Sequence, residues 1–263
     1  MTWRIPASAS VGGGEMVRCA AVVFGLTCLV SATLAGVPAM AAPRSEASRP
    51  CIGVIAAADR FMVRKIGFTA FDSETFVAPV ESWGLDDLIA ARVRAAAGAG
   101  VTVLRLSYPK GAFDPFYDPP SRPAPPPGRQ LTEIVRRIAG STKCRRYVVI
   151  TASHAAYSST NTTPISGVGV YQASLTKKTY LYAHLFVTVF DGDSFAIRPN
   201  PYATFQSRLE RVFVPAKDFD REIDRTLFPA SAAEAANSTA LRNGARSVVT
   251  ESLDDFLPAF FRE

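Results

Sequence analysis

The sequence predicts an α/β protein with a mixed sheet: a parallel βαβαβ first half, an antiparallel meander in the second half, and helices on the faces. Three observations predict this fold class. Residues 52–58, 101–108 and 146–153 are short apolar runs, typical of strands covered on both faces. Segments with helical spacing of apolar residues separate these runs. From residue 167 onward, longer β-rich runs alternate with polar turns, as antiparallel strands do.

The first half begins with the strand at 52–58. Residues 63–80 hold two β-rich runs around a polar Asp-Ser-Glu segment, which predicts a hairpin or an extended excursion. Residues 82–100 form the clearest helix, with Asp86 and Asp87 in the first turn, where the helix dipole favours negative charge. The strand at 101–108 follows.

Residues 115–128 contain seven prolines and are predicted to be an exposed, stiff loop. This loop is either a spacer or a segment that docks a partner. A short helix at 131–140 then leads to the strand at 146–153, which completes the right-handed βαβαβ unit.

The second half is predicted to contain three strands and then three helices. The strands are expected at 167–175, 180–190 and 194–198, and the helices at 217–228, 231–244 and 247–261. Ser231 and Glu234 have the spacing of a capping box, and Pro258 predicts a kink or stop in the last helix.

The N-terminal region is typical of an export signal. Residues 16–41 combine a basic start, an uncharged apolar run and a small-residue cleavage site after about Ala41, so we expect a periplasmic or secreted protein. An uncleaved N-terminal membrane anchor is the alternative. Residues 1–15 are interpreted as an over-extended N-terminus and 42–50 as a linker, which leaves 51–263 as a single α/β domain.

Charge narrows the classes of partner. Removing residues 1–41 lowers the net charge only from +6 to +5, and the Lys and Arg residues are spread along the chain. No basic stripe is interleaved with aromatic residues, so we expect no nucleic-acid partner. We expect at most peripheral membrane contact, and an envelope protein as a possible partner.

Two cysteines remain after export, Cys51 and Cys144, and each directly precedes a predicted strand. If the two strands are parallel neighbours, the thiols lie at the same end of the sheet, at about disulfide distance. The bridge would close a loop of 93 residues. Two free thiols are the alternative.

Polar residues at strand ends form the candidate site. Ligands of open α/β sheets bind outside the carboxyl ends of the strands, where Asp59, Ser153 and His154 are expected. These three could serve as catalytic residues of a hydrolase, but the chain has no G-x-S-x-G nucleophile elbow. The other interpretations are a hydrogen-bonded strand end, or non-catalytic ligand binding that adds Ser158 and Asn161 from the following loop.

Other chemistry has little support in the sequence. The two histidines, His154 and His184, lie thirty residues apart without a second ligand nearby, so we expect no metal. His184 lies in an alternating strand and is interpreted as a satisfied sheet residue. Glycine-rich phosphate loops are absent, and we expect no cofactor.

The segment "GVGVYQAS…YLYAHLFVTVFDGDSFAI" carries a resemblance. Together with the preceding β-α-β step, it resembles the layout of curli-secretion-like and penicillin-binding-protein-activator-like periplasmic accessory proteins, over about residues 51–200. The resemblance implies an assembly or binding role without catalysis. The chain also resembles uncharacterised exported bacterial proteins. We therefore expect an exported non-catalytic binding or assembly-accessory protein, with the hydrolase as the alternative.

Overall fold

The computed structural model describes residues 51–58, 60–68, 70–117, 126–156, 164–203 and 219–262. Its strands are β1 (Cys51–Ala56), β2 (Arg60–Ile66), β3 (Glu74–Pro79), β4 (Thr102–Arg105), β5 (Arg146–Ala152), β6 (His154–Ala156), β7 (Pro164–Ala173), β8 (Thr179–Asp191) and β9 (Phe219–Ile223). Its helices are α1 (Leu85–Ala97), α2 (Asp114–Tyr117), α3 (Pro127–Ala139), α5 (Ala232–Asn237), α6 (Thr239–Phe256) and α7 (Pro258–Phe261). Short 3-10 turns lie at Ala70–Asp72, Glu81–Trp83 and Arg225–Leu227.

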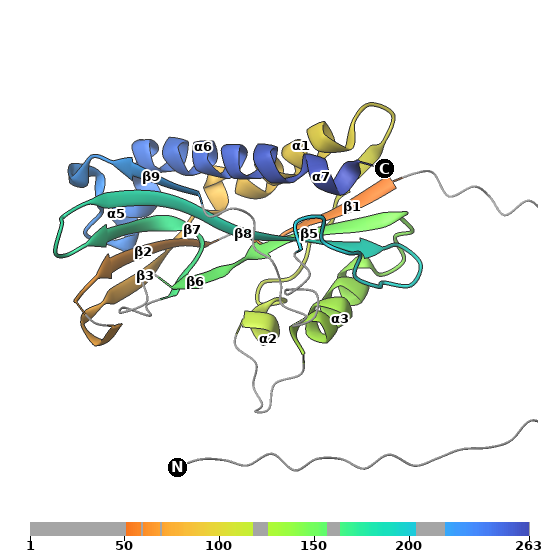
Figure 1. Cartoon of the computed structure of the whole chain (residues 1–263), viewed down its shortest axis with the longest axis horizontal. Helices are drawn as coiled ribbons and strands as arrows, with labels where there is room; N and C mark the ends of the chain where they lie inside the picture. The colour runs from red at the N-terminus through yellow and green to blue at the C-terminus, as the bar shows by residue number, and fades with distance from the viewer. Residues whose placement is uncertain are drawn as a thin grey trace, which may run out of the picture. The chain divides into compact units, whose positions relative to one another are not determined.

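The predicted α/β class and the parallel first half are confirmed. β1 pairs in parallel with β4 on one side and with β5 on the other. β8 then pairs antiparallel with β5 and with β7, as the meander predicted. Figure 1 shows α1, α6 and α7 on one face of the sheet and α2 and α3 on the other.

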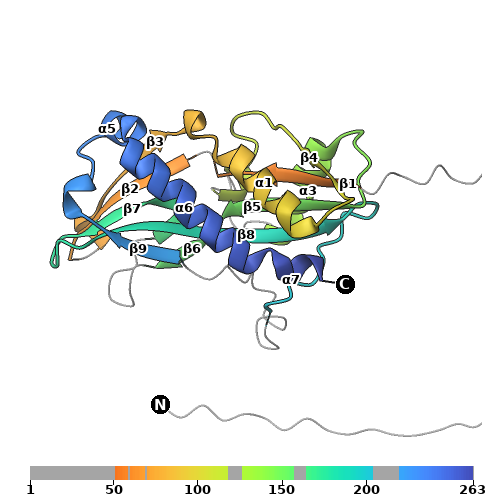
Figure 2. The same cartoon turned by 90° about the horizontal axis from the view of Figure 1, so that it is seen from above.

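The described strands form a sheet in the order β3-β2-β7-β8-β5-β1-β4, with β6 paired to β7 and β9 paired to β8. Within the sheet, β2 lies end to end with β1, and β7 lies end to end with β5, as Figure 2 shows. Each of these two pairs of strands thus forms one line of the sheet. The register supports this, because Ala152 pairs with Leu185 and Gly167 pairs with the next residue back along β8, His184. Ala152 and Gly167 therefore follow each other along one line of the sheet although fourteen residues separate them in the sequence, and Gly167 has a left-handed φ of 71°.

Two apolar cores, the two largest of the three apolar clusters in the described part of the chain, hold the layers together. The larger core lies between the sheet and helices α1 and α6, where alternate residues of β8 such as Leu181, Leu185 and Val189 are buried. The smaller core lies between β1, β5 and α3, and includes Ile55, Val149 and Leu131. β1 is buried along its whole length because both of its faces are covered.

Three predictions for the second half are wrong. The boundary expected between helices at 231–244 and 247–261 lies instead at Ser238, because α6 runs unbroken from Thr239 to Phe256. The other two are a helix at 217–228 and a strand at 194–198. Residues 217–228 were expected to form a helix, but Phe219–Ile223 form β9 and Arg225–Leu227 a 3-10 turn. Phe219 and Ile223 lie four residues apart, a spacing that fits one face of a helix and also one face of a strand. Residues 194–198 form no strand, and only Ile197 makes an isolated bridge to Phe190.

The helix boundaries at the C-terminus follow local signals. The Ser231 hydroxyl accepts a hydrogen bond from the Glu234 amide at 3.1 Å, as the capping box predicted. Pro258 separates α6 from α7. None of the helices in the described ranges is long and apolar enough to cross a membrane.

Candidate functional site

Ser153 and His154, the two predicted site residues that the structure describes, lie near the centre of the sheet, because β5 does not end at an open rim. β7 continues the line of β5, so the expectation that the sheet stops there is wrong. Ser153 is fully buried, and its amide donates a hydrogen bond of 2.9 Å to the His184 carbonyl. His154 begins β6, where its backbone pairs with Ser166.

Three of the five predicted site residues, Asp59, Ser158 and Asn161, lie outside the described residues. The hydrolase remains a prediction from the sequence. Among the residues that the structure describes, no group of three or more His, Cys, Asp or Glu side chains could hold a metal ion.

A buried polar cluster surrounds the second histidine, His184, on the face of the sheet opposite α6. Its Nε2 atom lies 3.1 Å from Oδ1 of Asp220 on β9, and its ring lies 5.1 Å from the ring of Tyr182. The His184 side chain is 3% exposed. This contact agrees with the interpretation of His184 as a satisfied sheet residue.

Tyr182 is the least accessible member of this cluster. Burial raises the pKa of its hydroxyl far above the ordinary value, and the positive charge of Arg64 opposes this rise. Its hydroxyl fits because the paired residue is a glycine: a Cβ on Gly169 would lie 2.5 Å from the hydroxyl oxygen. The phenol thus stays protonated, and Tyr182 and His184 are part of the packed interior.

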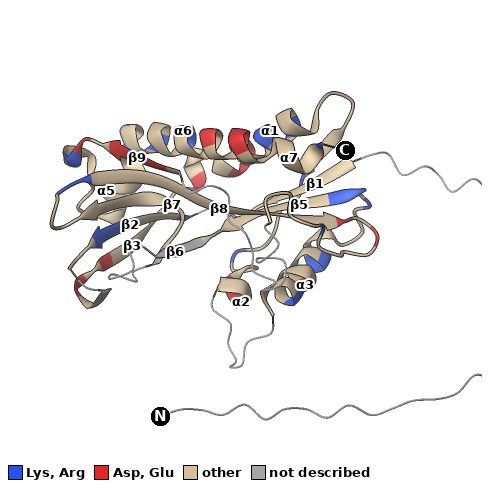
Figure 3. Ribbon diagram, viewed as in Figure 1, with Lys and Arg blue, Asp and Glu red and all other residues tan. Residues whose placement is uncertain are grey.

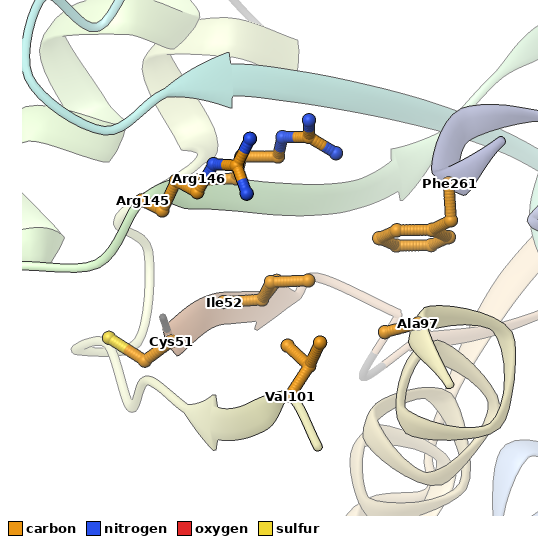
Figure 4. Close-up of a pocket in the computed structure, with 7 residues that line it drawn as sticks. All are labelled: Cys51, Ile52, Ala97, Val101, Arg145, Arg146 and Phe261. Carbon is orange, nitrogen blue, oxygen red and sulfur yellow. The ribbon is translucent and has the colours of Figure 1, made fainter. Parts of the chain in front are cut away.

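One of the cavities in the described part of the chain, lined by two adjacent arginines, lies at the amino ends of β1 and β5, away from the predicted rim. It has a volume of about 240 Å³. Figure 4 shows two guanidinium groups and one phenyl ring around it; the lining residues are Cys51, Ile52, Ala97, Val101, Arg145, Arg146 and Phe261. Figure 3 shows the same basic start of β5 within the whole charge distribution. We call this cavity the arginine pocket.

The predicted disulfide borders the arginine pocket. Cys51 and Cys144 are bonded, with their Cα atoms 4.7 Å apart. The Arg145 amide donates a hydrogen bond of 3.0 Å to the Cys51 carbonyl, so the bridge and the first arginine are held by the same strand pair. The sequence predicted the bridge. It did not identify Arg145 and Arg146 as site residues, although the two arginines directly follow Cys144.

A second surface feature is a group of exposed apolar side chains at the opposite end of the sheet. The exposed fractions are 72% for Phe68, 101% for Phe71, 75% for Leu175 and 37% for Leu227. All four lie on connections at one end of the strands. At this end, β2 finishes beside β7 at the Ile66–Ala173 pair, and β8 begins beside β9 at the Thr179–Ile223 pair. We call these four residues the apolar end.

Comparison with known proteins adds little to this picture. No protein-family model matches the chain, and no curated protein matches it. Among solved structures, the chain is similar to the hypothetical protein CT253 from Chlamydia trachomatis, with a TM-score of 0.32 and 10% sequence identity over 79% of this chain and 99% of that one.

Proposed function

We propose that this is an exported, non-catalytic accessory protein that docks on a protein partner in the cell envelope through the apolar end. The observation that carries the proposal is the exposure of Phe68, Phe71 and Leu175 at one edge of the sheet. Large apolar side chains scattered singly are ordinary on a protein surface, whereas a group of them at one place is typical of an interaction site.

The loops that display these residues are held in place. The Phe68 amide donates a hydrogen bond of 2.8 Å to Oδ2 of Asp72, which closes the connection after β2. In the β7–β8 turn, the Lys177 amide donates to the Ala173 carbonyl at 2.8 Å. Ordered loops lose less conformational entropy on binding, which favours a docking role over a passive connection.

The charges around the apolar end favour a protein partner over an anionic membrane. Lys178 forms a 3.0 Å ion pair with Glu222, and Lys65 lies directly across from Glu74 in the β2–β3 pair. The local charge is therefore balanced, and electrostatic attraction to anionic lipid contributes little here. The expected export signal at 16–41 and the expected layout like that of periplasmic accessory proteins support a partner in the envelope.

Site-specific photo-crosslinking tests the proposal. A photoreactive residue at position 71 in the native host should capture one partner, and the same residue at Leu104, an exposed apolar position on the edge strand β4, should not. The purified partner should then bind the wild type, and bind the triple variant Phe68→Ser/Phe71→Ser/Leu175→Ser at least about tenfold more weakly.

The matched control removes exposed apolar side chains elsewhere, in Val77→Ser/Leu104→Ser. This variant should bind the partner like the wild type. Equal binding by the triple variant would overturn the proposal. Binding of the wild type to anionic vesicles instead of a protein would replace the partner with a lipid surface.

A further inference from the structure

We propose that a cavity beside the end of β2 and the start of β3 binds a free α-amino acid with an apolar side chain. The cavity has a volume of about 340 Å³ and is lined, among others, by Lys65, Glu74, Phe76, Gln172, Phe228 and Pro229. We call it the lysine–glutamate pocket. This inference goes beyond the docking role and does not depend on it, because the ligand binds the chain alone.

Strand pairing places the polar part of the pocket in one row. Lys65 on β2 pairs with Glu74 on β3 on one side and with Gln172 on β7 on the other. Paired residues of neighbouring strands put their side chains on the same face of the sheet, and the strands lie about 4.8 Å apart. A cation, a carboxylate and an amide are therefore within reach of one small ligand.

The two charges in this row suit a zwitterion. Lys178 and Glu222 form an ion pair of 3.0 Å, but the described residues show no such pair between Lys65 and Glu74, although both line the same cavity. An α-amino acid carries its ammonium and its carboxylate on one carbon, so it can donate to Glu74 and accept from Lys65 at the same time. A ligand with a single charge meets repulsion from one of the two residues.

The amide of Gln172 is held before a ligand binds. Its Nε2 atom donates a hydrogen bond of 2.9 Å to the hydroxyl of Thr179, which is fully buried. The oxygen of the same amide is an acceptor of the kind that an ammonium needs. A side chain that is already fixed loses less conformational entropy on binding, which favours this residue as part of a site.

The rest of the named lining is apolar. Phe76 and Phe228 are half-buried and pack against the large core, and Pro229 is buried. Aromatic side chains offer a large apolar surface on which another ring or an aliphatic group can pack. The pocket therefore favours an amino acid with an apolar side chain over glycine.

Hydrogen bonds hold this apolar wall on both sides. The Phe228 amide donates to the Arg225 carbonyl at 3.2 Å, which ties the wall to the 3-10 turn after β9. The Ala230 amide donates to Oε2 of Glu234 at 2.8 Å, which ties it to α5. The wall is thus in place before a ligand arrives, which lowers the cost of binding.

The volume limits the size of the ligand. About 340 Å³ corresponds to roughly eleven water molecules at about 30 Å³ each, and phenylalanine, with about twelve non-hydrogen atoms, has a similar size. Phenylalanine also carries both charges and a ring that can pack on Phe76 and Phe228. It is therefore a suitable probe of the class.

An NMR titration of the full oxidised chain with phenylalanine tests the inference. The backbone amides of Lys65, Glu74 and Gln172 should show saturable shifts. N-acetylphenylalanine lacks the ammonium, phenylalaninamide lacks the carboxylate, and glycine lacks the apolar side chain. Each of these three should bind at least about tenfold more weakly than phenylalanine. The first two also represent the C-terminal and N-terminal residues of a peptide, so they distinguish a free amino acid from a chain end.

Variants assign the binding to this pocket. Lys65→Gln and Glu74→Gln each change an exposed side chain, so they should retain the fold, and each should weaken phenylalanine about tenfold or more. The matched controls, Lys178→Gln and Glu222→Gln, make the same charge changes in an ion pair outside the pocket and should leave affinity unchanged.

Three results would overturn the inference. They are no saturable binding of phenylalanine, equal binding of any of the three analogues, and equal weakening by the control variants. None of these results bears on the docking role, because the crosslinking assay measures capture of a protein through Phe71 and needs no amino acid.

Discussion

Reduction of the Cys51–Cys144 bridge should destabilise the protein strongly, because the bridge closes a loop with a sequence separation of 93. In the chain-entropy treatment, a closed loop of this length restricts the unfolded chain by about 4.6 kcal/mol at 25 °C. The folded state should change little on reduction, since both cysteines are buried in the small core and remain packed there. Nearly all of the effect is therefore expected in the unfolded state.

Urea unfolding of the oxidised and reduced protein, followed by circular dichroism, measures this difference directly. The same side chains are present in both samples, so no substitution confounds the comparison. Thermal unfolding is a second measure of the same loss: its midpoint should be about 9–18 °C lower in the reduced protein, for a domain of this size. The matched control is Cys51→Ala/Cys144→Ala, whose stability should not respond to the reductant.

Two outcomes would refute the reasoning. Thiol labelling that finds two free cysteines in the unreduced, exported protein would show that the bridge does not form. A loss below about 1 kcal/mol on reduction would show that residual structure already holds the unfolded chain together between the two cysteines.

Three further predictions concern the sheet. Gly169→Ala would place a Cβ 2.5 Å from the Tyr182 hydroxyl oxygen and should cost about 1–3 kcal/mol in urea unfolding; a cost below about 0.5 kcal/mol would mean that β7 shifts freely. Asp220→Ala removes the 3.1 Å contact to buried His184 and should cost about 1–2 kcal/mol, with a smaller loss for Asp220→Asn; no loss in either would show that the contact contributes nothing. Hydrogen bonds from the backbone and a hydroxyl of the following turn lower the pKa of Asp191, so its contribution to stability is present above the unfolded value of about 3.9 and is lost as the pH falls through the lower folded pKa. Carbon-13 NMR titration should give a carboxyl midpoint below that value, and a midpoint at or above it would contradict the assignment.

The features that local sequence determines were predicted well. Short apolar runs located β1, β4 and β5, and the cysteines before β1 and β5 located the disulfide, because both observations depend only on neighbouring residues. The Ser231 cap and the break at Pro258 were predicted for the same reason. The local pattern gave a wrong prediction at Phe219–Ile223, because the spacing of its apolar residues fits both a helix and a strand. Pairing with β8 makes this segment a strand.

The candidate sites depend on long-range contacts, and the sequence located them poorly. The parallel pairing of β2 with β7 joins residues more than a hundred positions apart, and it turns the expected open rim into the middle of a sheet. His184 meets Asp220 only because β8 and β9 are neighbours. The sequence-based candidates Ser153 and His154 lie where β5 ends and β6 begins.

The sequence by itself determined the fold class, the parallel first half and the covalent link between Cys51 and Cys144, since apolar periodicity and cysteine position are local properties. Only the tertiary structure decided where apolar and charged side chains gather. Arg145 and Arg146 meet Phe261 because the start of β5 lies beside the last helix, and Phe68 lies near Leu175 because β2 and β7 end together. Such groups depend on which strands and helices become neighbours, and burial of the whole core sets that choice.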